Sequence, residues 1–362
     1  MTLTADAFTG SLLAVEGIRD ATVVLNGPTG CKYYHSHISD KQYPKASSLD
    51  PLGYTEEFYF GQPRIPCTYL EGQDYIGGGT EKLQRILPAI ASKNNDLLVI
   101  VNSPGASLIG DDLKRFIDSA SLSKRCIAIE VETVLCAGTS IEELRRSSSV
   151  AFNLVIFPEY GLKIAKWYEE RFDIPYIISQ EGGPVGYDAT EMWIEKIACS
   201  MSVDPSKAIE MVKKERKKHY HKISRFYSLT GLPKGATFLI KGDSSVVLPL
   251  TKWLYEYLGM EPLGVKTLPG MCSGTERQII DLLENIGFAD SWNNFSDDIP
   301  VDVVLADGHT VKMMSEKKLC RSGIEISMPS SGYLNFLPRT YIGINGALFL
   351  LEQIFNGLRR MP

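Results

Sequence analysis

Two cysteines in turn-forming segments are the residues of this chain best suited to chemistry. Cys31 closes the segment 26–31, which reads Asn-Gly-Pro-Thr-Gly-Cys after an apolar run, and Cys67 closes the proline-rich segment 62–67. An apolar strand followed by a Gly/Pro turn predicts that a helix begins near Cys31. A helix N-terminus favours the thiolate, which is the form of cysteine that binds metal. The two thiols therefore indicate a metallocluster more than a disulfide.

The number of thiols sets a condition on such a cluster. A [4Fe–4S] cluster usually takes four thiolates, so two per chain are too few, and a homodimer or a related second subunit would have to supply the others. Gly30 and Pro66, which directly precede the two cysteines, are expected to contact the cluster. The residues alone leave open an alternative, in which both thiols are buried and act as small apolar side chains. A packing role is expected for the other cysteines, Cys126, Cys136, Cys199 and Cys320, whereas Cys272 stays undecided.

The composition is that of an ordinary globular protein. The chain has 362 residues, of which 44% are hydrophobic and 22% are charged, and its net charge of -5 gives no reason to expect a nucleic-acid partner. No apolar run approaches the length that spans a bilayer, and the first residues lack the basic region of a signal peptide. We therefore expect a cytoplasmic protein without a membrane partner. Seven cysteines in a chain of this length do not form a disulfide framework.

Apolar, β-rich runs alternate with helical patterns, which predicts an α/β fold with parallel sheets, in two or three Rossmann-like domains. The expected strands are 22–25, 97–101, 126–131, 154–157, 236–240 and 301–305, and the expected helices include 80–92, 162–172 and 246–258. We place a cluster-binding domain at 1–150, a second α/β domain at 151–230, and a third with a C-terminal helix at 231–362. Ligands of parallel sheets bind beyond the carboxyl ends of the strands, which here carry the segments 26–28, 102–105, 158–159, 241–243 and 306–309. Aromatic residues near these ends, such as Phe157 and Tyr160, are expected to give an organic ligand a largely apolar pocket.

Several short motifs, in order over nearly the whole chain, resemble the nitrogenase component 1 family. Segment 27–31 resembles the first cluster-cysteine motif of the family, and Cys67 with 74–79 behind it resembles the second. Further matches are the "IGDD" segment at 108–113, the "GIPY…G…T" stretch at 174–176 with Gly186 and Thr190, and the closing "GxxGA" helix start at 343–347. Asp173 replaces the first glycine of the "GIPY" motif. The resemblance favours the cluster over two packed thiols.

The chain also departs from nitrogenase itself. The third cysteine of the family would fall at about Pro104, where this chain has no thiol, so an eight-iron cluster is not expected. No counterpart of the cysteine and histidine that hold the iron–molybdenum cofactor is recognisable, which argues against dinitrogen reduction. The short length is closest to that of the reductive cyclase of nickel-tetrapyrrole synthesis.

The resemblance implies an oxidoreductase subunit that passes electrons through a [4Fe–4S] cluster, held at a subunit interface, to a small-molecule substrate. It implies an ATP-dependent iron–sulfur reductase as electron donor and, by analogy, a tetrapyrrole as substrate. It assigns no catalytic residue. One alternative is a non-catalytic scaffold on which a metallocofactor is assembled. Another is an α/β binding protein whose cysteines carry no metal.

Overall fold

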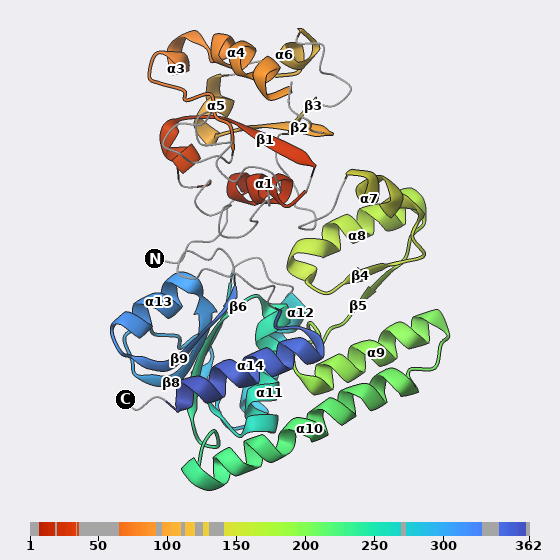
Figure 1. Ribbon diagram of the computed structural model, residues 1–362, viewed down its shortest axis with the longest axis vertical. Coiled ribbons are helices and arrows are strands. Elements are labelled where there is room, and N and C mark those ends of the chain that lie inside the picture. Colours follow the sequence, from red (N-terminus) through yellow and green to blue (C-terminus); the bar gives the residue numbers. More distant parts are fainter. Residues whose placement is uncertain are drawn as a thin grey trace, which may run out of the picture. The chain divides into compact units, whose positions relative to one another are not determined.

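The computed structural model describes residues 7–18, 20–33, 35, 65–91, 96–109, 113–119, 126–129, 141–268, 273–327 and 340–359. The chain forms two compact units, Leu3–Val150 and Ala151–Pro362, and all strand pairs in both are parallel (Figure 1). The predicted α/β class with parallel sheets is confirmed. Among the described helices, none has both the length and the apolar character that crossing a membrane requires.

The N-terminal unit contains a three-stranded sheet in the order β1-β2-β3. Its strands are β1 (Ala21–Asn26), β2 (Leu97–Asn102) and β3 (Cys126–Ile129). Its helices are α1 (Ala7–Glu16), α3 (Asp74–Gly77), α4 (Thr80–Ala91), α5 (Pro104–Ile109), α6 (Leu113–Ser119) and α7 (Ile141–Arg146), with a 3-10 turn at Ser147–Ser149. Ala21 pairs with Leu97 and Asn26 with Asn102, so β1 and β2 end at the same edge.

Both faces of this sheet are buried because successive side chains of a strand point to opposite sides. Val23 and Leu25 pack with α1 in one apolar cluster, whereas Val24 packs with α4 and α6 in another. A continuous apolar run such as that of β1 is therefore typical of a central parallel strand.

The C-terminal unit contains two sheets. A pair of strands, β4 (Asn153–Val155) and β5 (Tyr176–Ile178), is accompanied by α8 (Pro158–Phe172), α9 (Tyr187–Met201) and α10 (Ser206–Thr230). A four-stranded sheet has the order β7-β6-β8-β9, with β6 (Thr237–Gly242), β7 (Glu261–Thr267), β8 (Val301–Asp307) and β9 (Cys320–Ser327). The helices of this part are α11 (Ser244–Leu258), α12 (Ser273–Asn285), α13 (Gly308–Glu316) and α14 (Gly343–Leu358), with a 3-10 turn at Ala289–Ser291.

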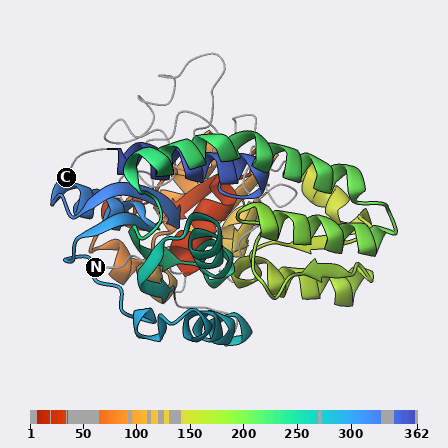
Figure 2. The ribbon, with the colours of Figure 1, turned by 90° about the horizontal axis from the view of Figure 1, so that it is seen from below.

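The largest apolar core joins one face of the four-stranded sheet to α11 and α14, and α13 packs on the other face. The long helix α10 lies along α9 and α14 (Figures 1 and 2). The predicted boundary at residue 230 coincides with the end of α10, but α10 and the four-stranded sheet belong to the same compact unit. The division into three domains therefore stays a prediction.

Candidate functional site

The carboxyl end of β1 is held by a network of polar side chains. The buried Asn26 donates from its amide to Asn102 Oδ1 at 2.9 Å and accepts from Thr68 Oγ1 at 2.8 Å. The Thr68 hydroxyl in turn accepts from the Gly27 N–H at 3.0 Å. Glycine is needed at position 27, because a Cβ there would lie 2.9 Å from both Cβ and Oγ of Ser103. The network fixes the segment around Thr68 at the strand edge where parallel sheets bind ligands.

Cys67 lies in backbone that pairs with the end of β1. Leu25 and Cys67 form a parallel bridge, in which the Leu25 N–H donates to the Pro66 carbonyl at 2.8 Å and the Thr68 N–H donates to the Leu25 carbonyl at 3.0 Å. The Cys67 side chain is only 4% exposed and belongs to the apolar cluster that contains Leu25. Pro66 thus positions the thiol through its carbonyl group.

Cys31 reaches the same apolar cluster. Residues 29–33 are helical, and the Lys32 N–H donates to the Pro28 carbonyl at 3.3 Å, so the predicted helix near Cys31 is present. Cys31 is partly buried and packs against the cluster that includes Leu25 and Cys67. Gly30 is exposed, and no atom lies within 4 Å of the position that a Cβ would take there. The fold therefore brings the two predicted thiols together.

The surroundings of Cys67 set the charge of its thiol. Burial raises the pKa of Cys67 to about 11, and Cys31 raises it as well, whereas the Tyr69 N–H and Lys32 act in the opposite direction. The thiol donates to the Gly27 carbonyl at 3.2 Å and its sulfur accepts from the Tyr69 N–H at 3.4 Å. The side chain is therefore a neutral thiol at neutral pH.

Lys82 braces the loop that follows Cys67, a role that sequence reasoning missed. Its ammonium donates to the Tyr69 carbonyl at 2.8 Å and to Asp74 Oδ2 at 2.7 Å. The Glu71 N–H and Lys82 lower the pKa of Asp74, so the carboxylate stays charged and holds Lys82. The Tyr69 N–H bonds to the Cys67 sulfur, so Lys82 holds the carbonyl of the residue whose N–H faces this thiol. In the sequence, the only indication for Lys82 is that it follows the second cysteine motif shortly after residues 74–79.

The other cysteines lie apart from this site or outside the described residues. Cys199 is exposed on α9, Cys320 is half-buried at the start of β9, and Cys126 opens β3. Cys136 and Cys272 fall outside the described residues. Within the described ranges, no group of three or more Cys, His, Asp or Glu side chains is arranged to hold a metal ion. The described part of one chain thus brings together two thiols and no larger set of such side chains.

A second polar group lies where β4 and β6 end in the C-terminal unit. The Tyr160 hydroxyl donates to Asp243 Oδ1 at 2.7 Å. Glu159 Oε1 accepts from Ser244 Oγ at 2.6 Å and from the Ser245 N–H at 2.7 Å, in the first turn of α11. Glu159 Oε2 and Ser245 Oγ are buried and have no hydrogen-bond partner among the residues that the structure describes. Glu159, Tyr160 and Asp243, with Ser244 and Ser245, form an acidic cluster. Its own contacts leave part of its hydrogen-bonding capacity unused.

Desolvation dominates the electrostatics of the acidic cluster. Burial raises the pKa of Asp243 to about 6, against the lowering effect of the Tyr160 hydroxyl, and the charge of Glu159 raises it as well. Burial and the same two carboxylates also raise the pKa of Tyr160. A carboxyl group with a pKa near 6 is partly protonated at neutral pH and is suited to general acid–base catalysis. Sequence reasoning placed Glu159, Tyr160 and Asp243 near strand ends and expected Tyr160 to form an apolar wall, but it gave none of them an acid–base role.

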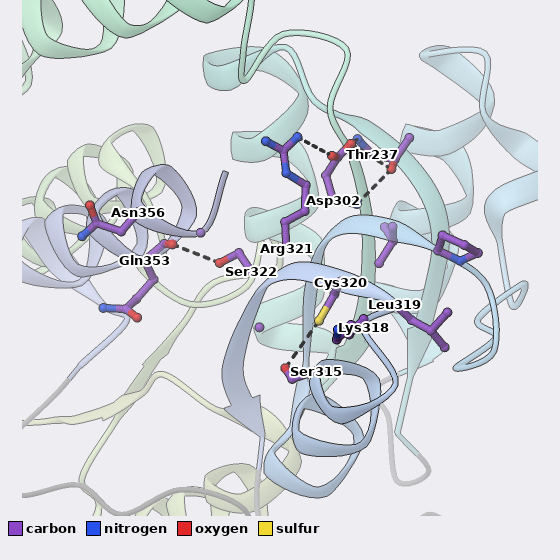
Figure 3. Close-up of a pocket in the computed structure, with 14 residues that line it drawn as sticks. Thr237, Asp302, Ser315, Lys318, Leu319, Cys320, Arg321, Ser322, Gln353 and Asn356 are labelled. Atoms are coloured by element: carbon purple, nitrogen blue, oxygen red, sulfur yellow. Dashed lines mark hydrogen bonds and ion pairs between the residues drawn. The ribbon is translucent and has the colours of Figure 1, made fainter. Parts of the chain in front are cut away.

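The four-stranded sheet also has a cavity of about 750 Å³ at the end where β6, β8 and β9 begin, opposite to the carboxyl ends of these strands (Figure 3). Its charged groups are largely paired with one another. Arg321 donates to Asp302 at 3.1 Å and to the Leu358 carbonyl, and Asp302 also accepts from the Thr237 N–H at 2.9 Å. The Cys320 sulfur lies 3.5 Å from Ser315 Oγ in the same cavity. The cavity is a junction between β9 and α14, away from the strand ends that carry the acidic cluster.

Curated relatives cover part of the chain. It is 20% identical over 266 residues to one subunit of the light-independent protochlorophyllide reductase of Chloroflexus aggregans, an alignment that covers 71% of this chain and 48% of that protein. The identity to the same subunit in Bradyrhizobium sp. (strain BTAi1) is 24% over 233 residues, which cover 60% of this chain and 43% of that protein. This chain spans about half the length of the curated relatives that it matches.

The fold and the family profile cover nearly all of the chain. A structure of nitrogenase Cp1 at pH 6.5 superposes with a TM-score of 0.70 at 16% sequence identity, over 99% of this chain and 93% of that one, which shows the fold. The profile of the nitrogenase component 1 type oxidoreductases matches residues 7–132 and 122–359. The chain therefore belongs to the nitrogenase component 1 type oxidoreductase family.

Proposed function

We propose that this chain is a subunit of a nitrogenase-like reductase that passes electrons through a [4Fe–4S] cluster to a small-molecule substrate. Members of its family use iron–sulfur clusters. The observation that carries the proposal is the meeting of Cys31 and Cys67 in one apolar cluster at the end of β1. Thiolates are the usual ligands of iron–sulfur clusters, so these two residues fit the group as half of a ligand set.

Two residues near Cys67 would stabilise the thiolate form that a cluster requires. The Tyr69 N–H, 3.4 Å from the Cys67 sulfur, would stabilise the thiolate, as would the buried Lys32, whose ammonium donates to the Ile65 carbonyl at 3.1 Å. When bound, the cluster supplies one-electron transfer at a potential set by burial and by hydrogen bonds to sulfur. The remaining ligands would come from a second copy or from a related chain. An ATP-dependent iron–sulfur reductase would be the electron donor.

The acidic cluster of the C-terminal unit would supply protons. Reduction of an organic double bond consumes one proton for each electron, and Asp243, with its pKa near 6, can release a proton at neutral pH. Tyr160 holds the Asp243 carboxyl in place through the 2.7 Å hydrogen bond. Because the relatives are by name protochlorophyllide reductase subunits, we propose a tetrapyrrole as the substrate class.

Iron and sulfide analysis after anaerobic purification tests the proposal. Cys31→Ser and Cys67→Ser should each remove the iron and the visible absorption of the cluster. Cys199→Ser is the matched control, because Cys199 is an exposed thiol on α9 and should leave both unchanged. A Cys31→Ser protein with its full iron content would refute the assignment. A monomer that carries a complete four-iron cluster would refute the sharing of ligands between subunits.

A further inference from the structure

Helix α10 carries a concentration of positive charge that the rest of the chain does not share. It contains eight Lys or Arg residues and two Glu residues, in a chain whose net charge is -5. Of its 25 residues only Val212 is fully buried. Tyr220 is 61% exposed and Leu229 is 77% exposed, so apolar side chains lie among the cations on its outer surface.

A groove of about 710 Å³ runs between α10 and α14, which lie side by side in Figure 2. Its floor is apolar and includes Ile223, Phe226, Leu351 and Phe355, with the Phe226 and Phe355 rings 4.8 Å apart. Three cations line it, Lys222, Arg225 and Arg359, together with the carboxylate of Glu352. The groove therefore combines an apolar floor with an excess of positive charge.

No ion pair within the described part of the chain neutralises these three cations. Elsewhere on α10, Arg216 pairs with Asp188 at 2.6 Å and Lys218 pairs with Glu215 at 3.4 Å. Lys222, Arg225 and Arg359, by contrast, form no ion pair with any residue that the structure describes. Their charges are thus available to an anionic ligand.

The positive charge of the groove and the length of the exposed surface along α10 together indicate the kind of ligand. A two-fold contact between copies of this groove would place its cations against one another, which is repulsive. The row of exposed cations and apolar side chains continues along α10 beyond the groove, farther than a small ligand would cover. An amphipathic helix matches both features, because apolar side chains at i, i+3, i+4 and i+7 fill such a groove while acidic side chains beside them meet the cations.

We propose that the α10–α14 groove binds an acidic amphipathic helix of a partner protein. The apolar face of that helix would pack on Phe226, Leu229 and Phe355, and its carboxylates would pair with Lys222, Arg225 and Arg359. None of the residues that line this groove belongs to the pair of thiols or to the acidic cluster, so the proposal does not depend on the proposed function.

A designed peptide can test the proposal on the purified full chain. The probe is a fluorescently labelled acidic peptide of roughly five helical turns, with leucine along one face and glutamate elsewhere. A basic control peptide has lysine in place of every glutamate. Fluorescence anisotropy should show saturable binding of the acidic peptide, at least about tenfold tighter than that of the basic peptide and weakened by salt.

Two charge-reversed double variants distinguish binding in the groove from nonspecific electrostatic binding. Lys222→Glu combined with Arg225→Glu should weaken binding by at least about tenfold, whereas Lys163→Glu combined with Lys166→Glu makes the same charge change on exposed residues of α8 and should have little effect. Leu229→Ser changes an exposed side chain that folding does not require and should also weaken binding. Equal binding of the two peptides, no saturable binding, or equal loss in both double variants would overturn the proposal.

Discussion

Replacement of Asp243 by asparagine should make the C-terminal unit more stable above pH 6. The Asp243 carboxyl is half-buried after the end of β6, and its charged form is disfavoured there, as the rise of its pKa from 3.8 to about 6 indicates. Asparagine has the same shape and keeps an oxygen that can accept the hydrogen bond from the Tyr160 hydroxyl. The substitution therefore removes the buried charge without opening a cavity.

The size of the effect follows from linkage between proton binding and folding. Between pH 3.8 and about 6 the folded state binds the proton that the unfolded state has released, so the stabilising effect of the neutral acid is lost as pH rises through the folded pKa. Each unit of pKa difference corresponds to about 1.4 kcal/mol, which gives an upper bound of ~3 kcal/mol. Because Asp243 keeps partial contact with solvent, we expect about 2 kcal/mol.

Urea unfolding followed by tryptophan fluorescence can measure this difference. All four tryptophans, Trp167, Trp193, Trp253 and Trp292, lie in the C-terminal unit, so the signal reports on that unit. The stability of Asp243→Asn minus that of the native chain should rise between the two pKa values, 3.8 and about 6, and then level off. Asp204→Asn, at an exposed site where Ser206 lowers the pKa, is a control that should show no such rise. A flat difference curve, or a less stable variant above pH 7, would refute the reasoning.

Three further substitutions test the structure around both sites. Gly27→Ala should lower stability by about 1–3 kcal/mol, since the new Cβ would lie 2.9 Å from the Ser103 side chain, and thermal unfolding followed by circular dichroism should show partial rescue by an added Ser103→Gly. Lys82→Met should release iron faster during a chelator challenge than Lys163→Met, an exposed control on α8, because Lys82 anchors the carbonyl of Tyr69, the residue whose N–H faces Cys67. Gly186→Ala should destabilise the C-terminal unit and shift its tryptophan fluorescence, since φ is 82° at this residue and the Cβ would lie 2.6 Å from Trp253 Cδ1. An unchanged fluorescence spectrum and melting temperature would contradict this packing of Gly186 against Trp253.

The strands that sequence patterns predicted are mostly those with apolar runs. The predicted runs correspond to β1, β2, β3, β4, β6 and β8, with ends that differ by a few residues. The strands that were missed, β5, β7 and β9, have physical reasons to escape notice. β5 has only three residues, β7 contains Pro262 and Gly264, and β9 carries Arg321 and Glu325 among its apolar residues. β7 and β9 are the edges of their sheet, where polar residues and proline are tolerated.

The motifs that carried the family resemblance are partly explained by backbone geometry. Asp173, where the family motif has glycine, ends α8 with φ of 55°, and Gly186 adopts φ of 82°. Both values lie in the left-handed region that glycine enters without steric strain. The Thr190 hydroxyl of the same motif donates to the Gly186 carbonyl at 2.5 Å. Such motifs identify the fold because they encode turns, so they could not by themselves show which residues do chemistry.

The candidate sites depend on a property that spacing along the chain does not contain. Cys67 and Asp243 differ from Cys199 and Asp204 in burial, which raises the pKa of the first two to about 11 and about 6. That burial arises from distant partners, since the segment of Cys67 is held to β1 through Asn26, and the end of β4 contacts the end of β6. Motif order could point to Cys67 because its segment resembles the second cysteine motif of the family. It gave Asp243 no role, because desolvation of a carboxyl group becomes visible only once the strand ends have been brought together.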